Sequence, residues 1–335
     1  MTRRFGLTIK RIISRKPRWL AAAPYLEQLI PAPVFIIIHV TLGCKKSCEF
    51  CYQMRDEFFN MHEGILPVSD FEKILCQAGK FLYKPHIHLF GGEPLDHPEF
   101  PRLLSLCRQY RFRPTFTTNG ELLLRFAQTI RDSSVTQINL SLEPLRHPGD
   151  FPATLLKAIA ALSPRVRFNA NYTITRQSLA ALQSTIEACS LLFPKGEIET
   201  FVCQHWAFEE KDQPEVRGWD IAGLKGQLAE IESRSWPFRF ITMPQIARED
   251  IESYYTDWDY PFARKCCVPW LGLSVYPDLS VTPGGASFAC TEIVGTMQKQ
   301  TLSSLWHSPS LKSFRGRVRR EFPRRCTRCC HHAYY

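Results

Sequence analysis

The first 205 residues predict an α/β fold, a partial (β/α)6 barrel of the TIM type, and three observations point to it. Short apolar runs rich in β-branched side chains alternate with longer segments of helical spacing. About six such pairs follow one another, each long enough for a right-handed parallel crossover. Motifs that suit catalytic chemistry follow the first two expected strands, where barrels of this type place their active sites.

The expected strands and helices alternate in chain order. The first strand, residues 34–40, is followed by a helix over 67–82 that places Phe71, Ile74 and Phe81 at helical spacing. The other strands are expected over residues 86–90, 114–118, 137–142, 167–174 and 197–202, and the other helices over 100–109, 122–130, 153–162 and 179–192. Polar and apolar residues alternate along the fifth strand, so one polar face is expected to line the barrel.

The alternation stops near residue 205, and the chain is expected to have four parts. A basic N-terminal extension covers residues 1–33, and the barrel covers residues 34–205. Residues 206–262 are charged and interrupted by proline, which predicts a linker or bridging region. Residues 263–335 hold six of the 13 cysteines and are expected to form a small metal-binding unit.

The composition fits a globular enzyme. The 335 residues are 44% apolar and 22% charged, so the chain can bury a large core. The sequence has no run of about 18 apolar residues and no pattern of a secretory signal. Its cysteines are clustered, which favours metal binding in a reducing compartment over disulfides, so a cytoplasmic location is expected.

Three cysteines directly follow the first expected strand. Cys44, Cys48 and Cys51 form the pattern Cys-x3-Cys-x2-Cys. Three thiolates in so short a loop suit a [4Fe-4S] cube whose fourth iron has no protein ligand, and an open iron is where a substrate or cofactor can bind. Zinc is the alternative, because Cys-x2-Cys fragments are common in zinc sites.

The second expected strand ends in the turn Gly91-Gly92-Glu93-Pro94. The two glycines would let a ligand approach the backbone closely, and the carboxylate could reach an ammonium group. Alone, this turn is an ordinary end of a strand. Its place on the strand after the cysteine loop indicates a binding element.

These two motifs together resemble the radical S-adenosylmethionine (SAM) superfamily. The resemblance implies that the open iron is chelated by the amino and carboxylate groups of SAM. An electron from the cluster would then cleave SAM to a 5'-deoxyadenosyl radical. It also implies that the Gly-Gly-Glu-Pro turn binds the SAM amino group and that Phe50 packs by the adenine. The cofactor-binding residues implied in this way are Phe50, Tyr52, Gly91, Gly92, Glu93, Pro94, Ser141 and Asn171.

The last two of these residues belong to later strands. Ser141 is expected at the SAM ribose, and Glu143 is the alternative, because the register decides which of them faces the interior. Asn171, on the polar face of the fifth strand, is expected to touch the adenosyl group or to be solvated. Asn119-Gly120 at the end of the third strand is interpreted as a turn.

The C-terminal part resembles the SPASM/twitch extension of radical SAM enzymes, which carries auxiliary iron–sulfur clusters. The resemblance rests on Cys-x2-Pro-Trp, a hairpin expected over residues 271–282, a central cysteine, Leu-x2-Leu-Trp-x-Ser and a final Cys-x2-Cys. It implies one auxiliary [4Fe-4S] cluster with the ligands Cys266, Cys290, Cys326 and Cys329. Cys267 and Cys330 are the alternatives to Cys266 and Cys329, and zinc is the alternative to iron.

The net charge of +10 is less specific. The arginines near the last cysteines are interpreted as a solvated helix face and as counter-charge for anionic clusters. The basic, partly apolar N-terminus suits a peripheral contact with an anionic membrane surface. No basic–aromatic module for nucleic acids is present, so no nucleic-acid partner is expected.

The sequence therefore predicts a radical SAM oxidoreductase or modifying enzyme that abstracts hydrogen from a substrate carbon. A ribosomally made peptide is the favoured substrate, to be oxidised or cross-linked. A small sugar, alcohol or amino acid, dehydrogenated by a twitch-type enzyme, and a lipid-linked substrate are the alternatives. The class also implies an electron donor such as flavodoxin or ferredoxin. An iron–sulfur or zinc scaffold without activity is the alternative outside enzymes, and the oligomeric state is left open.

Overall fold

The computed structural model describes residues 30–51, 64–208, 210–260, 266–285 and 290–329 of the chain. Three sequence-based expectations lie outside the described residues: those on most of the N-terminal extension, on Tyr52 and on Cys330. No helix in the described ranges is long and apolar enough to cross a membrane.

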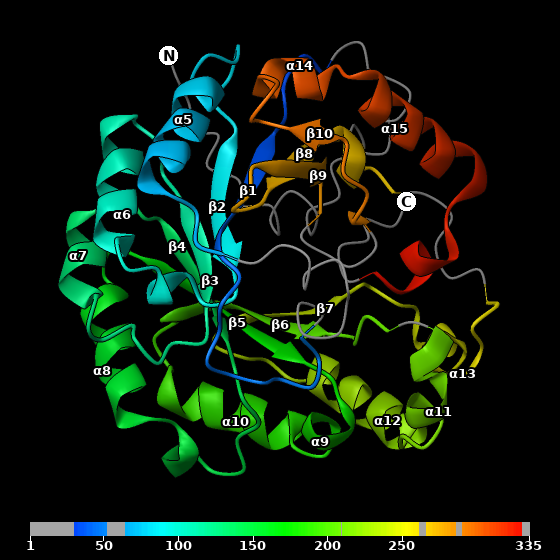
Figure 1. The fold of residues 1–335 in the computed structure, drawn as a ribbon. Coiled ribbons are helices and arrows are strands. Elements are labelled where there is room, and N and C mark those ends of the chain that lie inside the picture. Colours follow the sequence, from blue (N-terminus) through cyan, green and yellow to red (C-terminus); the bar gives the residue numbers. More distant parts are fainter. Residues whose placement is uncertain (1–29, 52–63, 209, 261–265, 286–289, 330–335) are drawn as a thin grey trace.

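One ten-stranded sheet organises the described chain, in the order β10-β9-β8-β1-β2-β3-β4-β5-β6-β7 (Figure 1). Strands β8 and β1 to β7 run parallel, and β9 pairs in the antiparallel sense with both of its neighbours, β8 and β10. The strands are β1 (Phe35–Thr41), β2 (His86–Gly91), β3 (Thr115–Thr118), β4 (Gln137–Ser141), β5 (Arg167–Thr173), β6 (Ile198–Gln204), β7 (Arg239–Met243), β8 (Gly272–Val275), β9 (Ser280–Pro283) and β10 (Gly295–Thr296). The predicted partial barrel with a small C-terminal extension is confirmed.

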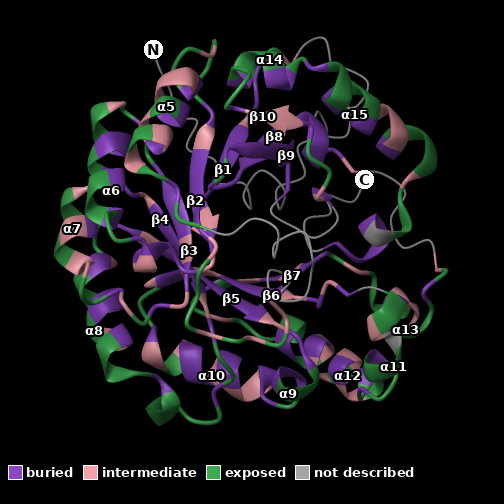
Figure 2. Cartoon of the chain, in the orientation of Figure 1, coloured by how far each residue is buried: buried purple, intermediate pink, exposed green. Residues whose placement is uncertain are grey.

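Helices cover the outer face of the sheet, and their sides toward the strands are buried while their outer sides are exposed (Figure 2). They are α5 (Val68–Ala78), α6 (Phe100–Gln109), α7 (Ala127–Asp132), α8 (Ala153–Leu162), α9 (Arg176–Leu179), α10 (Leu182–Leu192), α11 (Gln213–Val216), α12 (Ile221–Ser233), α13 (Ile251–Thr256), α14 (Leu302–Trp306) and α15 (Pro309–Glu321). Every residue of β1 is buried, as expected of a parallel strand covered on both faces.

The two faces of the sheet carry different side chains. On β5, Phe168, Ala170 and Tyr172 belong to the apolar core, so the alternating Asn169 and Asn171 point to the opposite face. The Asn169 amide there donates a hydrogen bond of 3.1 Å to the Asn139 side chain of β4. The polar face predicted for the fifth strand therefore lines the inside of the barrel.

Two features extend the predicted sheet. The segment expected to be a linker contributes β7, which pairs in parallel with β6 from Thr200↔Arg239 to Gln204↔Met243. The predicted C-terminal hairpin forms as β8 and β9, and β8 pairs in parallel with β1. The C-terminal unit thus continues the sheet of the barrel. The four expected domain boundaries stay a prediction.

Candidate active site and auxiliary cysteine site

Cys44, Cys48 and Cys51 lie on the loop that leaves the C-terminal end of β1. Cys44 is exposed, and the other two are partly buried. The Cys51 N–H donates to the Cys48 carbonyl at 3.0 Å, and the Lys46 N–H donates to the Cys44 sulfur at 3.4 Å. Burial raises the pKa of the Cys48 thiol to about 11, and Glu143, Cys51 and Cys44 act in the same direction. The three thiols are therefore close enough to affect one another, as ligands of one cluster must be.

The two glycines after β2 are packed against this loop. A Cβ on Gly91 would lie 1.8 Å from the Thr41 carbonyl oxygen, and one on Gly92 would lie 1.9 Å from the Gly43 carbonyl oxygen. Gly91 also has a φ of +128°, which disfavours other residues. The Gly92 and Glu93 N–H groups donate to the Thr41 and Gly43 carbonyls at 2.8 and 2.9 Å. The sequence predicts that a ligand approaches these glycines closely. In the structure the backbone of the cysteine loop does so, and this contact joins the loop to the Gly-Gly-Glu-Pro turn.

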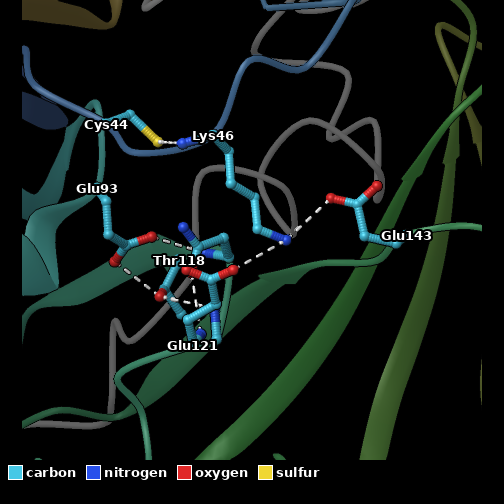
Figure 3. Close-up of polar contacts among 8 residues, drawn as sticks. Cys44, Lys46, Glu93, Thr118, Glu121 and Glu143 are labelled. Atoms are coloured by element: carbon cyan, nitrogen blue, oxygen red, sulfur yellow. Dashed lines mark hydrogen bonds and ion pairs between the residues drawn. The ribbon is translucent and has the colours of Figure 1, made fainter. Parts of the chain in front are cut away.

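Glu93 is 2% exposed, and its carboxylate is held by three donors. Figure 3 shows this carboxylate beside Thr118. Oε1 accepts from the Leu95 N–H at 3.0 Å and the Thr118 hydroxyl at 2.8 Å, and Oε2 accepts from the Asn119 N–H at 2.8 Å. Burial raises the pKa of this carboxyl, and the three hydrogen bonds oppose the rise. A carboxylate can accept about four hydrogen bonds, so one acceptor position remains beyond these three.

Sequence reasoning missed the part played by the end of β3. Asn119-Gly120 was expected to be only a turn, yet Thr118 and Asn119 hold the Glu93 carboxylate. The available signal was positional: a Thr-Thr-Asn-Gly element ends the strand next to the Gly-Gly-Glu-Pro element, and parallel strands bring their ends to one edge of the sheet.

Lys46 links the cysteine loop to two further strand ends (Figure 3). Its ammonium lies 3.2 Å from Glu143, which follows β4, and 3.5 Å from Glu121, which follows β3. Burial lowers the pKa of Lys46, but the two carboxylates outweigh this and the net pKa is raised. Glu143, the alternative to Ser141 as a ribose contact, is exposed, and its carboxylate is ion-paired with Lys46 of the cysteine loop.

The remaining expected SAM contacts lie around the same edge of the sheet. Ser141 ends β4, is partly buried and is the register partner of the buried Asn171. Phe50 is partly buried against the main core, and Pro94 is buried and begins the 3-10 helix η2 (Pro94–Asp96). These placements are compatible with the expected roles, and contact with SAM stays a prediction for each residue.

His39 on β1 and His88 on β2 are packed within the barrel. Both ring nitrogens of His88 lie near hydroxyls of β3, Nδ1 at 2.8 Å from Thr115 and Nε2 at 3.1 Å from Thr117. His39 is stacked on Tyr276 with the ring centroids 4.3 Å apart. These contacts of His88 are thus hydrogen bonds within the core, and the contact of His39 is a ring contact.

The C-terminal cysteines gather from three segments. Cys266 precedes the 3-10 helix η6 (Val268–Trp270), Cys290 follows β9, and Cys326 and Cys329 flank the end of η8 (Arg324–Arg328). Burial raises the pKa of the Cys266 thiol well above its usual value, and Cys267, Cys326 and Cys329 add to the rise. Burial also raises the pKa of the Cys290 thiol well above its usual value, and Cys329 and Cys266 add to this rise. Cys266 is thus close to Cys267, Cys326 and Cys329, and Cys290 is close to Cys329 and Cys266.

The surroundings of these sulfurs suit an iron–sulfur cluster. The backbone N–H groups of Val268 and Gly285 lower the pKa of the Cys266 and Cys290 thiols against the effect of burial, and backbone N–H groups near the sulfurs stabilise cluster thiolates. Within the described residues, no three His, Cys, Asp or Glu side chains converge on one metal-ion position. A cube does not require this convergence, because each thiolate binds a different iron.

Two family models match the chain. The model of the radical SAM superfamily matches residues 38–170, and the model of the SPASM iron–sulfur cluster-binding domain matches residues 266–330. Together the matches cover more than half of the sequence and include both sets of cysteines.

Curated relatives are similar over shorter or more divergent stretches. A GTP 3',8-cyclase from Acidothermus cellulolyticus is 35% identical over 121 residues, 34% of this chain and 33% of that protein. A probable GTP 3',8-cyclase from Methanothermobacter marburgensis is 32% identical over 114 residues, 34% and 36% of the two chains. The chain therefore spans about a third of the length of these cyclases. An AdoMet-dependent heme synthase from Methanosarcina barkeri is 22% identical over 297 residues, 83% of each chain.

Solved structures share the fold. Streptococcus suis SuiB bound to S-adenosylmethionine has a TM-score of 0.62 at 17% identity, covering 93% of this chain and 74% of that one. SuiB bound to its precursor peptide SuiA gives 0.62 at 18% identity with the same coverage. At this level of identity, the likeness concerns the fold alone.

Proposed function

Because the chain belongs to the radical SAM superfamily and carries a SPASM domain, we propose that it oxidises or cross-links a peptide by radical chemistry. Its cofactors are a [4Fe-4S] cluster, SAM and an auxiliary iron–sulfur cluster. When bound, these groups supply reductive cleavage of SAM to a 5'-deoxyadenosyl radical, abstraction of hydrogen from a substrate carbon, and uptake of the remaining electron.

The chain's own residues would hold and orient these groups. Cys44, Cys48 and Cys51 would bind the catalytic cluster. Glu93 would use its remaining acceptor position to fix the SAM ammonium, and Ser141 and Asn171 would contact the ribose and the adenosyl group. The observation that carries the proposal is the joining of the cysteine loop to the Gly-Gly-Glu-Pro turn by the Gly91 and Gly92 contacts.

The second cysteine set would bind the auxiliary cluster through Cys266, Cys290, Cys326 and Cys329. With four protein ligands, no iron is left for the substrate, which suits transfer of an electron. The parallel pairing of β8 with β1 supports a common role for the two sites, because both belong to one sheet.

A peptide substrate is supported by the shared fold with SuiB, a protein solved with its precursor peptide. A second candidate is the modification of a small molecule, and the AdoMet-dependent heme synthase favours it because that similarity spans 83% of both chains. A flavodoxin or ferredoxin would supply electrons in either case.

The test is an anaerobic assay of the reconstituted, reduced protein with SAM. One reaction contains a short peptide encoded beside the chain's gene, and the other contains a porphyrin precursor. We expect the peptide to accelerate formation of 5'-deoxyadenosine and to lose two hydrogen atoms by mass spectrometry. The variant with Cys44, Cys48 and Cys51 changed to Ala is the control and should form neither product. Turnover of the porphyrin precursor alone would replace the first candidate by the second.

A further inference from the structure

Two buried arginines lie in, or bond to, the segments that carry the auxiliary cysteines. Arg315, on α15, is 2% exposed, and Arg328, on η8, is fully buried. The arginines near the last cysteines are expected to form a solvated helix face and to supply counter-charge for anionic clusters. Arg319 and Arg320 on α15 follow the first of these expectations, because both are exposed. Arg315 and Arg328 do not, and a buried guanidinium needs a reason because its desolvation is costly.

Arg328 stands between Cys326 and Cys329 and fixes their turn to the segment once expected to be a linker. Its guanidinium donates to the Asp257 carbonyl and, at 2.9 Å, to the Thr327 hydroxyl. Three aromatic rings surround it, with centroids 5.0 Å away for Tyr254, 5.4 Å for Trp258 and 5.7 Å for Phe208. These contacts connect one pair of expected ligands to residues 208–258 of the bridging region.

Arg315 makes the corresponding contacts to the other cysteine segment. Its Nε donates at 2.9 Å to the carbonyl of Pro269, which lies in η6 directly after Cys266 and Cys267. Its guanidinium also lies 4.3 Å from the centroid of the Trp306 ring. Arg315 thus bonds to the backbone of the segment that carries Cys266. Arg328 lies in the segment that carries Cys326 and Cys329, and it bonds to the backbone of the bridging region.

The positive charge of the two guanidinium groups has a second effect, on the reduction potential of the cluster. A guanidinium stays protonated at any pH at which proteins are folded. Reduction adds one negative charge to an iron–sulfur cluster, and a positive charge in the same poorly screened volume favours that reduced form. A buried arginine near the ligands therefore raises the reduction potential, whereas an exposed arginine is screened by water and salt.

We propose that Arg315 and Arg328 are positioning residues that fix the two cysteine segments and raise the reduction potential of the auxiliary cluster, so that it accepts an electron. The inference rests on the proposed function, since it takes the four cysteines as ligands of an iron–sulfur cluster. It adds the residues that would set the direction of electron transfer.

The test uses the full chain with Cys44, Cys48 and Cys51 changed to Ala, so that the auxiliary cluster alone is observed. In this background, Arg315→Gln, Arg328→Gln and Arg328→Lys are compared by redox titration followed by electron paramagnetic resonance, with iron measured for each sample. Arg319→Gln is the matched control, because Arg319 is on the same helix and its guanidinium lies 5.6 Å from the Trp270 ring, but it is exposed.

We expect the two Gln variants to have more negative potentials than the background protein, Arg328→Lys to recover most of the shift, and Arg319→Gln to change little. If Arg328→Gln does not retain its iron, the reduction potentials of Arg315→Gln and Arg328→Lys decide whether the inference holds. Unchanged potentials with iron retained, or an equal shift in Arg319→Gln, would overturn the inference and leave the proposed function standing. Zinc in place of iron in the background protein would overturn both.

Discussion

The Lys46 ammonium lies 3.2 Å from the Glu143 carboxylate, and this contact ties the loop between two expected cluster ligands to the end of β4. Glu121 adds a second carboxylate at 3.5 Å from the neighbouring strand end. The cysteine loop is therefore held on one side by the glycines after β2 and on the other by ionic contacts. The two kinds of attachment differ in strength, and they can be tested separately.

Lys46→Met should loosen the catalytic cluster modestly. The carboxylates are about half exposed, so the contacts contribute at most about 1 kcal/mol, or roughly fivefold in an equilibrium. The measurement is the loss of iron to a chelator at low and high salt, and the variant should differ from the wild type mainly at low salt. Lys45→Met is the control, because Lys45 is 78% exposed and its ionic contact, with Asp96 at 3.7 Å, is weak. Equal effects of the two changes would contradict the role of Lys46.

Gly92→Ala should disrupt the catalytic site. The added Cβ would lie 1.9 Å from the Gly43 carbonyl oxygen, and backbone rather than a flexible side chain would have to move. Overpacking of this kind costs about 1–3 kcal/mol. Gly43→Ala provides the matched control, since its Cβ would have its nearest contact at 3.6 Å. Iron content and unfolding midpoint are the measurements, and a Gly92→Ala protein that keeps four irons at this site and its stability would refute the expectation.

Glu93→Ala should weaken SAM binding, because a charged hydrogen bond in a buried site is worth about 1.5–3 kcal/mol, or roughly ten- to a hundredfold in affinity. The same change leaves the Thr118 and Asn119 donors without their acceptor and should lower stability. Equilibrium dialysis with SAM separates the effects when compared with Thr118→Val, which removes one donor and keeps the carboxylate. Glu99→Ala, an exposed carboxylate, is the neutral control. Unchanged affinity in Glu93→Ala would remove the residue from the SAM site.

His205 should make the protein sensitive to acid. It is 1% exposed with Nδ1 2.8 Å from the Tyr255 hydroxyl, and burial lowers its pKa to about 3. The unfolded chain, with a histidine pKa of about 6.5, binds the proton first as pH falls, so stability declines below pH of about 6.5 at up to about 1.4 kcal/mol per pH unit. His205→Gln should flatten this decline in urea unfolding of the reduced apoprotein at pH 7 and 5. The exposed His307→Gln should leave it as steep as in the wild type.

Iron content tests the two cysteine sets together. The reconstituted protein should bind about eight irons per chain, as two four-iron clusters. Changing Cys44, Cys48 and Cys51 to Ala should remove half, and changing Cys326 and Cys329 should remove the other half. A wild-type value near four irons together with one zinc would assign zinc to the C-terminal cysteines and leave the catalytic cluster unaffected.

The sequence predicted the parts of the fold that local pattern determines. The strands from residue 34 to 202 were found because each is an apolar run between helical segments. The strand at Arg239–Met243 was missed because it is short, begins with an exposed arginine and follows a charged segment. Its pairing with β6 is a tertiary effect that the local pattern does not carry.

In the candidate sites, too, the sequence predicted the local motifs but not the contacts that depend on tertiary packing. Cys44 and Glu93 were recognised from their motifs, but the reason for Gly91 and Gly92 appears only when β1 and β2 are side by side. The burial of Arg328 depends on aromatic residues more than 70 positions earlier, such as Tyr254. A count of arginines cannot distinguish such a residue from an exposed one.

The pairing of β8 with β1 has a consequence for biosynthesis. Strand β1 is apolar and fully buried, yet its partner on one edge is translated only after residue 271. Until then, the nascent chain exposes an unpaired edge of the kind that attracts other strands. One edge of the first strand therefore receives its partner only with the last part of the chain, although β2 can pair with the other edge early. A ribosome-bound fragment ending before β8 should depend on chaperones to stay unaggregated.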